Sequence, residues 1–338
     1  MSIAYTIMWQ RSWLGVAAFA LGVLGAPGNA TAQSSAKAFR IGWLGNSVPP
    51  EGSSQGVADF EQALREFGYV AGRNLTIVYR YGNGDANRLA EHAAEFARIP
   101  VDLIVTSGER AAEAARRATT AIPVIVTEIA VDPVKQGLVS SLGRPGGNIT
   151  GFTTLSDELW LKRIGLVKEV KPSISRLTVL WNPGNPGNKI CLDEIRAAAT
   201  TMRVQVRDFE VPDFTTLGRA RAAIAKDPPD AITACWDSVT VENAKSIADL
   251  ALKLRIPTLA PIREYVQAGW LMSEGASLPV ERRHAARYVD KILKGAKPAN
   301  LPVEQPDAFP LVVNRTTAKA IGITMPAAFG FAVEEWID

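Results

Sequence analysis

Short apolar runs alternate with amphipathic stretches along most of this chain. The run at residues 122–127 is β-branched and apolar, which suits a strand buried on both faces of a parallel sheet. Other runs at residues 39–44, 75–81 and 101–106 also indicate strands, and the stretches between them repeat apolar residues at helical spacing. The predicted helices are residues 56–67, 87–98 and 110–119. Regular alternation of strands and helices with short connections predicts a doubly wound parallel sheet.

The second half of the chain repeats this strand–helix order. Strands are predicted at residues 176–181, 204–211, 231–235, 256–260 and 270–272. Helices are predicted at residues 159–170, 188–202, 214–225 and 241–254. No internal repeat of the sequence itself is apparent, but the shared pattern predicts a second α/β lobe.

Two segments mark where the chain crosses between the lobes. The Arg-Pro-Gly-Gly-Asn sequence at residues 144–148 breaks any helix, and residues 149–152 then begin a new extended segment. Ser273, Glu274 and Gly275 follow the apolar run at residues 270–272 and form a second expected crossing.

Five phrases of the sequence carry a family resemblance. They are DPVKQGLVSSLGRPGGNITG at residues 132–151, TVLWNPGNP at 178–186, REYVQAGWLMSEG at 263–275, YVDKILKGAKPANLPVEQP at 288–306 and LVVNRTTAKAIGITMP at 311–326. In this order they resemble the periplasmic substrate-binding proteins of ABC importers in the tryptophan/tyrosine-type family. The resemblance covers nearly all of the chain after about residue 38.

The resemblance implies a type I periplasmic binding protein fold, with two doubly wound parallel-sheet lobes joined by a three-segment hinge. Residues 38–151 with 279–303 would form lobe 1, and residues 152–278 with 304–338 would form lobe 2. The third hinge segment would lie at residues 301–306. The family also implies a monomer that binds a small-molecule ligand and delivers it to an ABC permease with its ATPase at the inner membrane.

Residues 1–32 have the features of an export signal. Arg11 precedes an apolar run at residues 13–24, and Ala30, Thr31 and Ala32 give a small-residue cleavage pattern. The run is shorter than the roughly 18 residues of a membrane span, so a retained anchor is the less favoured alternative. We therefore expect a soluble protein in the periplasm.

Composition and charge exclude several classes of function. With 47% hydrophobic residues, 21% charged residues and a net charge of +3, the 338-residue chain has no basic footprint for nucleic acid. Its two Cys and two His form no zinc-type cluster, and no motif calls for a cofactor. Cys191 and Cys235 are interpreted as two small buried hydrophobes in preference to a disulfide, which the oxidising compartment would allow.

Polar residues follow the strands of both predicted lobes. Because the carboxyl ends of parallel strands in open α/β sheets are where ligands bind, we expect these residues to surround a small-molecule site between the lobes. The candidate ligand-binding residues are Asn46, Ser47, Ser107, Gly108, Glu128, Asp132, Phe152, Asn182, Trp236, Asp237, Arg263 and Glu274.

Ser107 and Gly108 stand between a strand and a helix start, where free N–H groups and the helix dipole favour an anion such as a ligand carboxylate. A plain helix cap is an equally weighted alternative. A ligand ammonium would need a carboxylate, for which Glu128, Asp237 and Glu274 are candidates.

Flat apolar surface for a ligand ring could come from Trp43, Phe152, Trp181 and Trp236, although core packing is the favoured interpretation of Trp43 and Trp181. The resembled family often has an aromatic residue in place of Glu274, and a carboxylate there would favour a cationic or amine-bearing ligand.

The favoured function is the periplasmic solute receptor of an ABC importer for an amino acid or another aromatic or amine-bearing compound. A sensor module that signals to a membrane receptor is the alternative. An enzyme on the same fold is less favoured, because the chain has no nucleophile elbow, Walker loop, Rossmann glycine run or His-centred triad.

Overall fold

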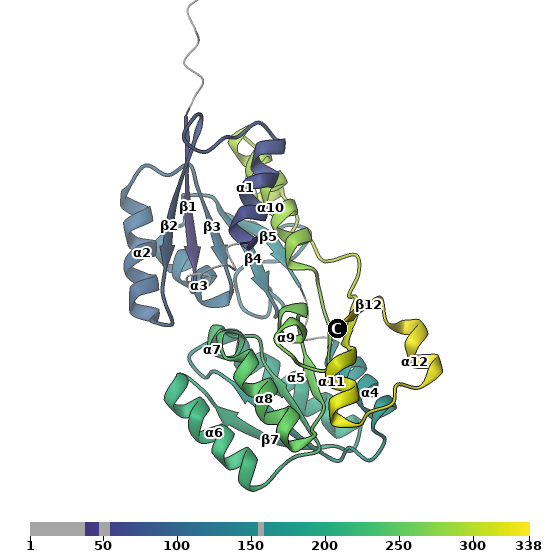
Figure 1. Ribbon diagram of the computed structural model, residues 1–338. Helices are drawn as coiled ribbons and strands as arrows, with labels where there is room; N and C mark the ends of the chain where they lie inside the picture. Colours follow the sequence, from purple (N-terminus) through teal and green to yellow (C-terminus); the bar gives the residue numbers. More distant parts are fainter. Residues whose placement is uncertain (1–37, 47–54, 155–158) are drawn as a thin grey trace, which may run out of the picture. The chain divides into compact units, whose positions relative to one another are not determined.

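The computed structural model describes residues 38–46, 55–154 and 159–338 (Figure 1). The predicted export signal at residues 1–32 and the candidate site residue Ser47 lie outside these ranges. Within them the chain forms two separate sheets, each covered by helices on both faces, as the pattern of apolar and polar residues predicts.

The first lobe contains a five-stranded sheet in the described residues, with the order β2-β1-β3-β4-β5 and all pairs parallel. Its strands are β1 (Phe39–Gly45), β2 (Leu75–Tyr81), β3 (Leu103–Ser107), β4 (Val124–Ile129) and β5 (Ile149–Thr153). Gly45 pairs with Ser107, and Ser107 pairs with Thr127. The polar residues that end β1, β3 and β4 are therefore at one level.

The helices of the first lobe divide between the two faces of this sheet. They are α1 (Gln55–Glu66), α2 (Ala86–Arg98), α3 (Glu109–Ala118) and α10 (Leu278–Leu293). Leu44 on β1 packs with apolar residues of α2 and α3, whereas Ile41 and Trp43 pack with those of α1 and α10. Helix α10 thus joins the first sheet from far along the chain.

The second lobe contains a seven-stranded sheet in the described residues, with the order β12-β11-β10-β9-β8-β6-β7. Its strands are β6 (Arg176–Trp181), β7 (Gln205–Glu210), β8 (Ala231–Ala234), β9 (Thr258–Ala260), β10 (Met272–Glu274), β11 (Leu311–Asn314) and β12 (Glu335–Ile337). Strands β10 and β11 pair antiparallel, and the other pairs of this sheet are parallel. The chain leaves the lobe along β10 and returns along the neighbouring β11, which must therefore run in the opposite direction.

The helices of the second lobe also cover both faces of its sheet. They are α4 (Trp160–Val170), α5 (Pro186–Thr201), α6 (Phe214–Lys226), α7 (Ser238–Glu242), α8 (Ala244–Leu254), α9 (Arg263–Gln267), α11 (Arg315–Ile321) and α12 (Ala327–Ala332). Leu177 and Val179 pack with α4, α5 and α11, and Leu180 packs with α6, α8 and α9. The predicted helix at 241–254 is in fact two helices, and α9, β11, α11, α12 and β12 were not predicted.

The crossing segments between the lobes depend on backbone packing that only glycine allows. Gly151 has a φ of +138°, and a Cβ there would lie 2.1 Å from the carbonyl oxygen of Val126. At Gly275 a Cβ would lie 1.8 Å from the carbonyl oxygen of Pro261. The first crossing also pairs with the last, because Thr153 N–H donates to Glu304 O and Glu304 N–H donates to Gly151 O.

Cys191 on α5 and Cys235 at the end of β8 form a disulfide. The sequence-based preference for two unpaired cysteines is therefore wrong. Both residues are buried, which agrees with the other half of that interpretation. Because α5 packs on the sheet beside β8, residues 44 positions apart in the sequence meet there.

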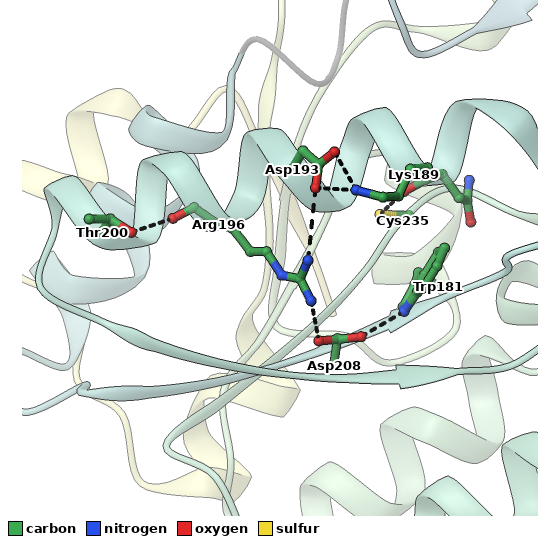
Figure 2. A network of polar contacts seen from close by, with 8 residues as sticks. Trp181, Lys189, Asp193, Arg196, Thr200, Asp208 and Cys235 are labelled. Carbon is green, nitrogen blue, oxygen red and sulfur yellow. Dashed lines mark hydrogen bonds and ion pairs between the residues drawn. The ribbon is translucent and has the colours of Figure 1, made fainter.

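Trp181 lies in the core of the second lobe, as its favoured interpretation predicts. Its indole Nε1 donates to Asp208 at 2.9 Å, and Arg196 on α5 contacts the other oxygen of that carboxylate at 2.8 Å. Figure 2 shows Arg196 between Asp193 and Asp208, with Lys189 on the far side of Asp193. This network fixes the indole at the edge of the core of the second lobe.

None of the helices in the described residues is long and apolar enough to cross a membrane.

The disulfide should stabilise the second lobe. The double variant Cys191→Ala/Cys235→Ala should lose about 4 kcal/mol of unfolding free energy, because a closed loop of this length restricts the unfolded chain. Urea unfolding followed by circular dichroism measures the loss. Reduction of the unaltered protein with dithiothreitol should give nearly the same loss without a change of packing, and equal stability of the oxidised and reduced forms would contradict the expectation.

Candidate functional site

Each sheet has one point where its strand order reverses. In the first sheet the chain passes from β1 to β2 on one side and then to β3 on the other, and in the second it passes from β6 to β7 and then to β8. Open α/β sheets bind ligands outside the carboxyl ends of the strands at such switch points. Asn46 and Ser107 lie at the first point, and Asn182 and Asp237 lie at the second.

A cleft of about 660 Å³ is lined by residues from both switch points. The first lobe contributes the ends of β1, β2, β3 and β4, and the second contributes the starts of α7 and α9. More than half of the predicted site residues line it, namely Asn46, Ser107, Gly108, Glu128, Trp236, Asp237 and Arg263.

The other described candidates lie outside this lining. Asp132 accepts a hydrogen bond from Val134 N–H in its own turn, and Phe152 is buried against the ring of Tyr288 at 4.8 Å. Asn182 lies behind Asp237, to which its Nδ2 donates at 3.0 Å.

Glu274 is fully buried and paired with Lys162. The prediction placed it after a strand at residues 270–272, but it lies within β10, where it pairs with Leu311. Its carbonyl oxygen accepts a hydrogen bond of 2.8 Å from Nε of the buried Arg163. The expectation that this carboxylate faces the ligand therefore has no support in the geometry.

Asp237 has its carboxylate occupied by the protein. It accepts hydrogen bonds from Asn182 and from Asn185 Nδ2 at 3.1 Å, and it caps α7 through Val239 N–H at 3.0 Å. A carboxylate with three donors has little capacity left for a ligand ammonium. Its effect on the cleft is to fix the start of α7 and the neighbouring Trp236.

The start of α3 has no side-chain cap. Gly108 occupies the N-cap with a φ of +87° and supplies no side-chain cap. A Cβ there would lie 2.4 Å from Nδ2 of Asn46, so glycine allows the side chain of Asn46 to lie against the helix start. A helix of this length presents N–H donors and a positive dipole end at that point.

Ser107, Glu128 and Arg282 form one chain of contacts beside this helix start. The Ser107 hydroxyl donates to Glu128 Oε2 at 2.5 Å, and Arg282 contacts Glu128 Oε1 at 2.7 Å. Ser107 therefore uses its hydrogen on a carboxylate of the protein. Glu128 has a φ of +59° at an irregularity in the pairing of β4 with β5, which accounts for how a strand residue reaches the cleft.

Two further glutamates surround this pair. Glu281 on α10 is buried, and its Oε2 accepts from the backbone N–H of Glu128 at 3.3 Å. Burial, reinforced by the charge of Glu128, raises the pKa of Glu281 to about 8. Burial likewise raises the pKa of Glu264 on α9, which lines the cleft. Burial is the largest single effect and would lower the pKa of Arg282, but the charge and hydrogen bond of Glu128, together with the charges of Glu264 and Asp59, outweigh it and raise the pKa.

Three buried polar atoms of cleft-lining residues have no hydrogen-bond partner within the described part of the chain. They are Asn46 Oδ1, Ser238 Oγ and Glu264 Oε2. Buried polar atoms are normally paired, so such atoms gathered in one cleft call for a ligand or solvent that pairs with them.

The aromatic lining comes from Trp43, Tyr81 and Trp236. Trp43 also packs against Phe60, with ring centroids 5.1 Å apart, so it serves both as core and as cleft wall. Burial and the charge of Glu61 raise the pKa of Tyr81.

Sequence reasoning missed Tyr81, Ser238, Glu264 and Arg282. Tyr81 ends a predicted strand, and Ser238 follows Asp237, so the strand-end rule could have included both. Glu264 follows the candidate Arg263 but lies on an unpredicted helix. Arg282 gave no signal, because a charged residue on a helix is normally at the surface. No group of three or more His, Cys, Asp or Glu in the described residues is arranged to hold a metal ion.

The raised pKa of Glu281 predicts a loss of stability at high pH. The folded-state pKa lies above the unfolded value, so the stability contributed by the neutral acid is present below the usual glutamate range and is lost as the pH rises towards about 8. Between about pH 5 and pH 9 the melting temperature of the unaltered protein should fall by several degrees relative to that of Glu281→Gln. Glu91→Gln, at an exposed position, is the control and should follow the unaltered protein, whereas parallel curves for all three would count against a neutral Glu281.

Comparison with known sequences identifies the family of this chain. The profile of the family described as ABC transporter substrate binding protein matches residues 48–333. A curated relative, the tyrosine-binding protein of Clostridioides difficile (strain R20291), is 28% identical over 263 residues, which are 78% of this chain and 75% of the relative.

Solved structures share the fold. A conserved domain protein from Vibrio cholerae O1 biovar El Tor has a TM-score of 0.81 at 26% identity, with 89% of this chain and 100% of that chain covered. An ABC domain from Streptococcus pneumoniae in complex with L-Trp has the same TM-score and coverage at 24% identity. The fold is that of the type I periplasmic binding proteins, as the sequence resemblance implies. The chain therefore belongs to the family of ABC transporter substrate-binding proteins, which bind a ligand and are not enzymes.

Proposed function

We propose that this protein is the periplasmic receptor of an ABC importer and that it captures an amino acid with an aromatic side chain in the cleft between its lobes. The observation that carries the proposal is the set of buried, unpaired polar atoms of Asn46, Ser238 and Glu264 around one cleft. A polar ligand would pair with these atoms, and the aromatic lining favours a ligand with a ring.

The ligand carboxylate would lie at the start of α3. The absence of a side-chain cap at Gly108 leaves the first-turn N–H groups of the helix to an incoming anion. Ser107 would act indirectly, because its hydroxyl holds Glu128 in place. The ligand ring would contact Trp43, Tyr81 and Trp236, which come from both lobes.

Capture would follow from contacts with two lobes at once. A ligand that contacts Gly108 in the first lobe and Trp236 in the second gains both sets of contacts only when the lobes are together. Ligand binding would therefore shift an existing equilibrium between open and closed forms towards the closed form. An ABC permease would recognise and bind that closed form.

The relatives support an aromatic amino acid as ligand. One curated relative is named for tyrosine, and the Streptococcus pneumoniae structure contains L-Trp. The expected export signal supports a periplasmic location, and family membership supports delivery to a permease and its ATPase by a monomeric carrier.

The variant Gly108→Ala should weaken binding of L-tyrosine or L-tryptophan by at least about tenfold, because the added Cβ displaces Asn46 from the helix start. Isothermal titration calorimetry measures the affinity, after a thermal-shift screen against the amino acids identifies the tighter ligand. Gly72→Ala is a matched control: its φ of +79° is close to that of Gly108, but nothing lies within 4 Å of the added atom.

Equal affinity of Gly108→Ala and Gly72→Ala for the same ligand would place the carboxylate elsewhere. A screen in which no amino acid raises the melting temperature of the unaltered protein would refute the proposed ligand class.

A further inference from the structure

The protein supplies no cation that is free to pair with the carboxylate of Glu264 in the described part of the cleft. Two guanidinium groups lie near it, and each is already paired with another carboxylate. Arg282 contacts Glu128, and Arg263 donates from Nε to Glu335 Oε2 at 2.8 Å. Glu264 has no such partner for its Oε2 within the residues that the structure describes.

Glu264 also stands between the lobes. It belongs to α9 of the second lobe, whereas the charged groups that face it, Glu128, Glu281 and Arg282, belong to β4 and α10 of the first lobe. The charge of Glu128 disfavours an ionised Glu264, and that of Arg282 favours it. Burial disfavours the ionised form of Glu264 more strongly than either of these charges affects it.

Burying an ionised carboxylate without a partner costs free energy, and a protein avoids this cost in one of two ways. The carboxylate either takes up a proton or pairs with a cation. Asn46 Oδ1 is a second unpaired buried acceptor in the lining of the same cleft. An ammonium group has three donors and a positive charge, so it satisfies acceptors that a neutral hydroxyl would satisfy only in part.

We propose that Glu264 is the residue that selects a ligand with a free ammonium group, and that the bound ammonium replaces a proton on Glu264. This inference rests on the proposed function. It assigns the ligand ammonium to Glu264, whereas the sequence analysis named Glu128, Asp237 and Glu274 as candidate partners of that group. Of these, Glu128 is occupied by Arg282 and Asp237 by two asparagines, whereas Glu274, whose Oε1 contacts Lys162, does not line the cleft.

The exchange has a direct consequence for empty and occupied forms. When the lobes are together without a cation, burial favours the neutral form of Glu264, which holds a proton taken from solvent. When an ammonium binds to this form, Glu264 gives that proton up to solvent and the carboxylate pairs with the ammonium. The affinity for an ammonium-bearing ligand therefore rises with pH until Glu264 is ionised in the empty form as well.

The test compares each amino acid with its analogue that lacks only the amine. The pairs are L-tyrosine with 3-(4-hydroxyphenyl)propionate and L-tryptophan with 3-indolepropionate, titrated by calorimetry into the unaltered protein and into Glu264→Gln. The unaltered protein should prefer the amino acid by at least about tenfold, and Glu264→Gln should lose most of that preference. Glu66→Gln, at an exposed position on α1, should keep it.

A second measurement uses the unaltered protein, so its result does not depend on whether a variant folds. For the unaltered protein, titrations of the preferred amino acid at about pH 6 in buffers of different ionisation enthalpy should show proton release, and titrations of its deaminated analogue should not. Glu281→Gln should still release a proton, which distinguishes Glu264 from its neighbour.

Three outcomes would overturn the inference even if the amino acid binds. They are equal affinity for both members of a pair, a preference that survives in Glu264→Gln, and the absence of proton release. Failure of all four compounds to bind the unaltered protein would instead overturn the proposed ligand class, and this inference with it.

Discussion

The requirement that buried charge be compensated organises the ligand cleft of this protein. Strands of both sheets end at the cleft, and so both sheets bring polar groups to it. The carboxylates of Glu128 and Asp237 are paired by the protein itself, Glu128 with Arg282 and Asp237 with Asn182 and Asn185. The few that remain unpaired identify the chemistry of the ligand more sharply than the lining as a whole, because each is costly without one.

The architecture was largely predictable because it follows from local patterns. Buried parallel strands have continuous apolar runs, and the alternation of strands and helices requires a doubly wound sheet. The strand-end rule then selected Asn46, Ser107 and Asp237, which lie at the two switch points. The antiparallel β11 was missed, since its direction depends on the path by which the chain returns from the other lobe.

The residues that sequence reasoning misplaced are those whose role depends on packing. Glu274 was expected to face the cleft, but pairing with β11 keeps it within a strand. Arg282 and Glu264 lie on helices, where a charge normally indicates the surface, and only the packing of α10 on the first sheet makes Arg282 a partner of Glu128. The disulfide of Cys191 and Cys235 likewise depends on the packing of α5 against the sheet.

A crystal structure of the protein with its amino acid bound is the most direct test of the central claim. We expect the ligand carboxylate at the start of α3, the ring among Trp43, Tyr81 and Trp236, and the ammonium within hydrogen-bond distance of Glu264. A ligand that leaves Glu264 Oε2 unpaired, or that binds outside this cleft, would contradict the account.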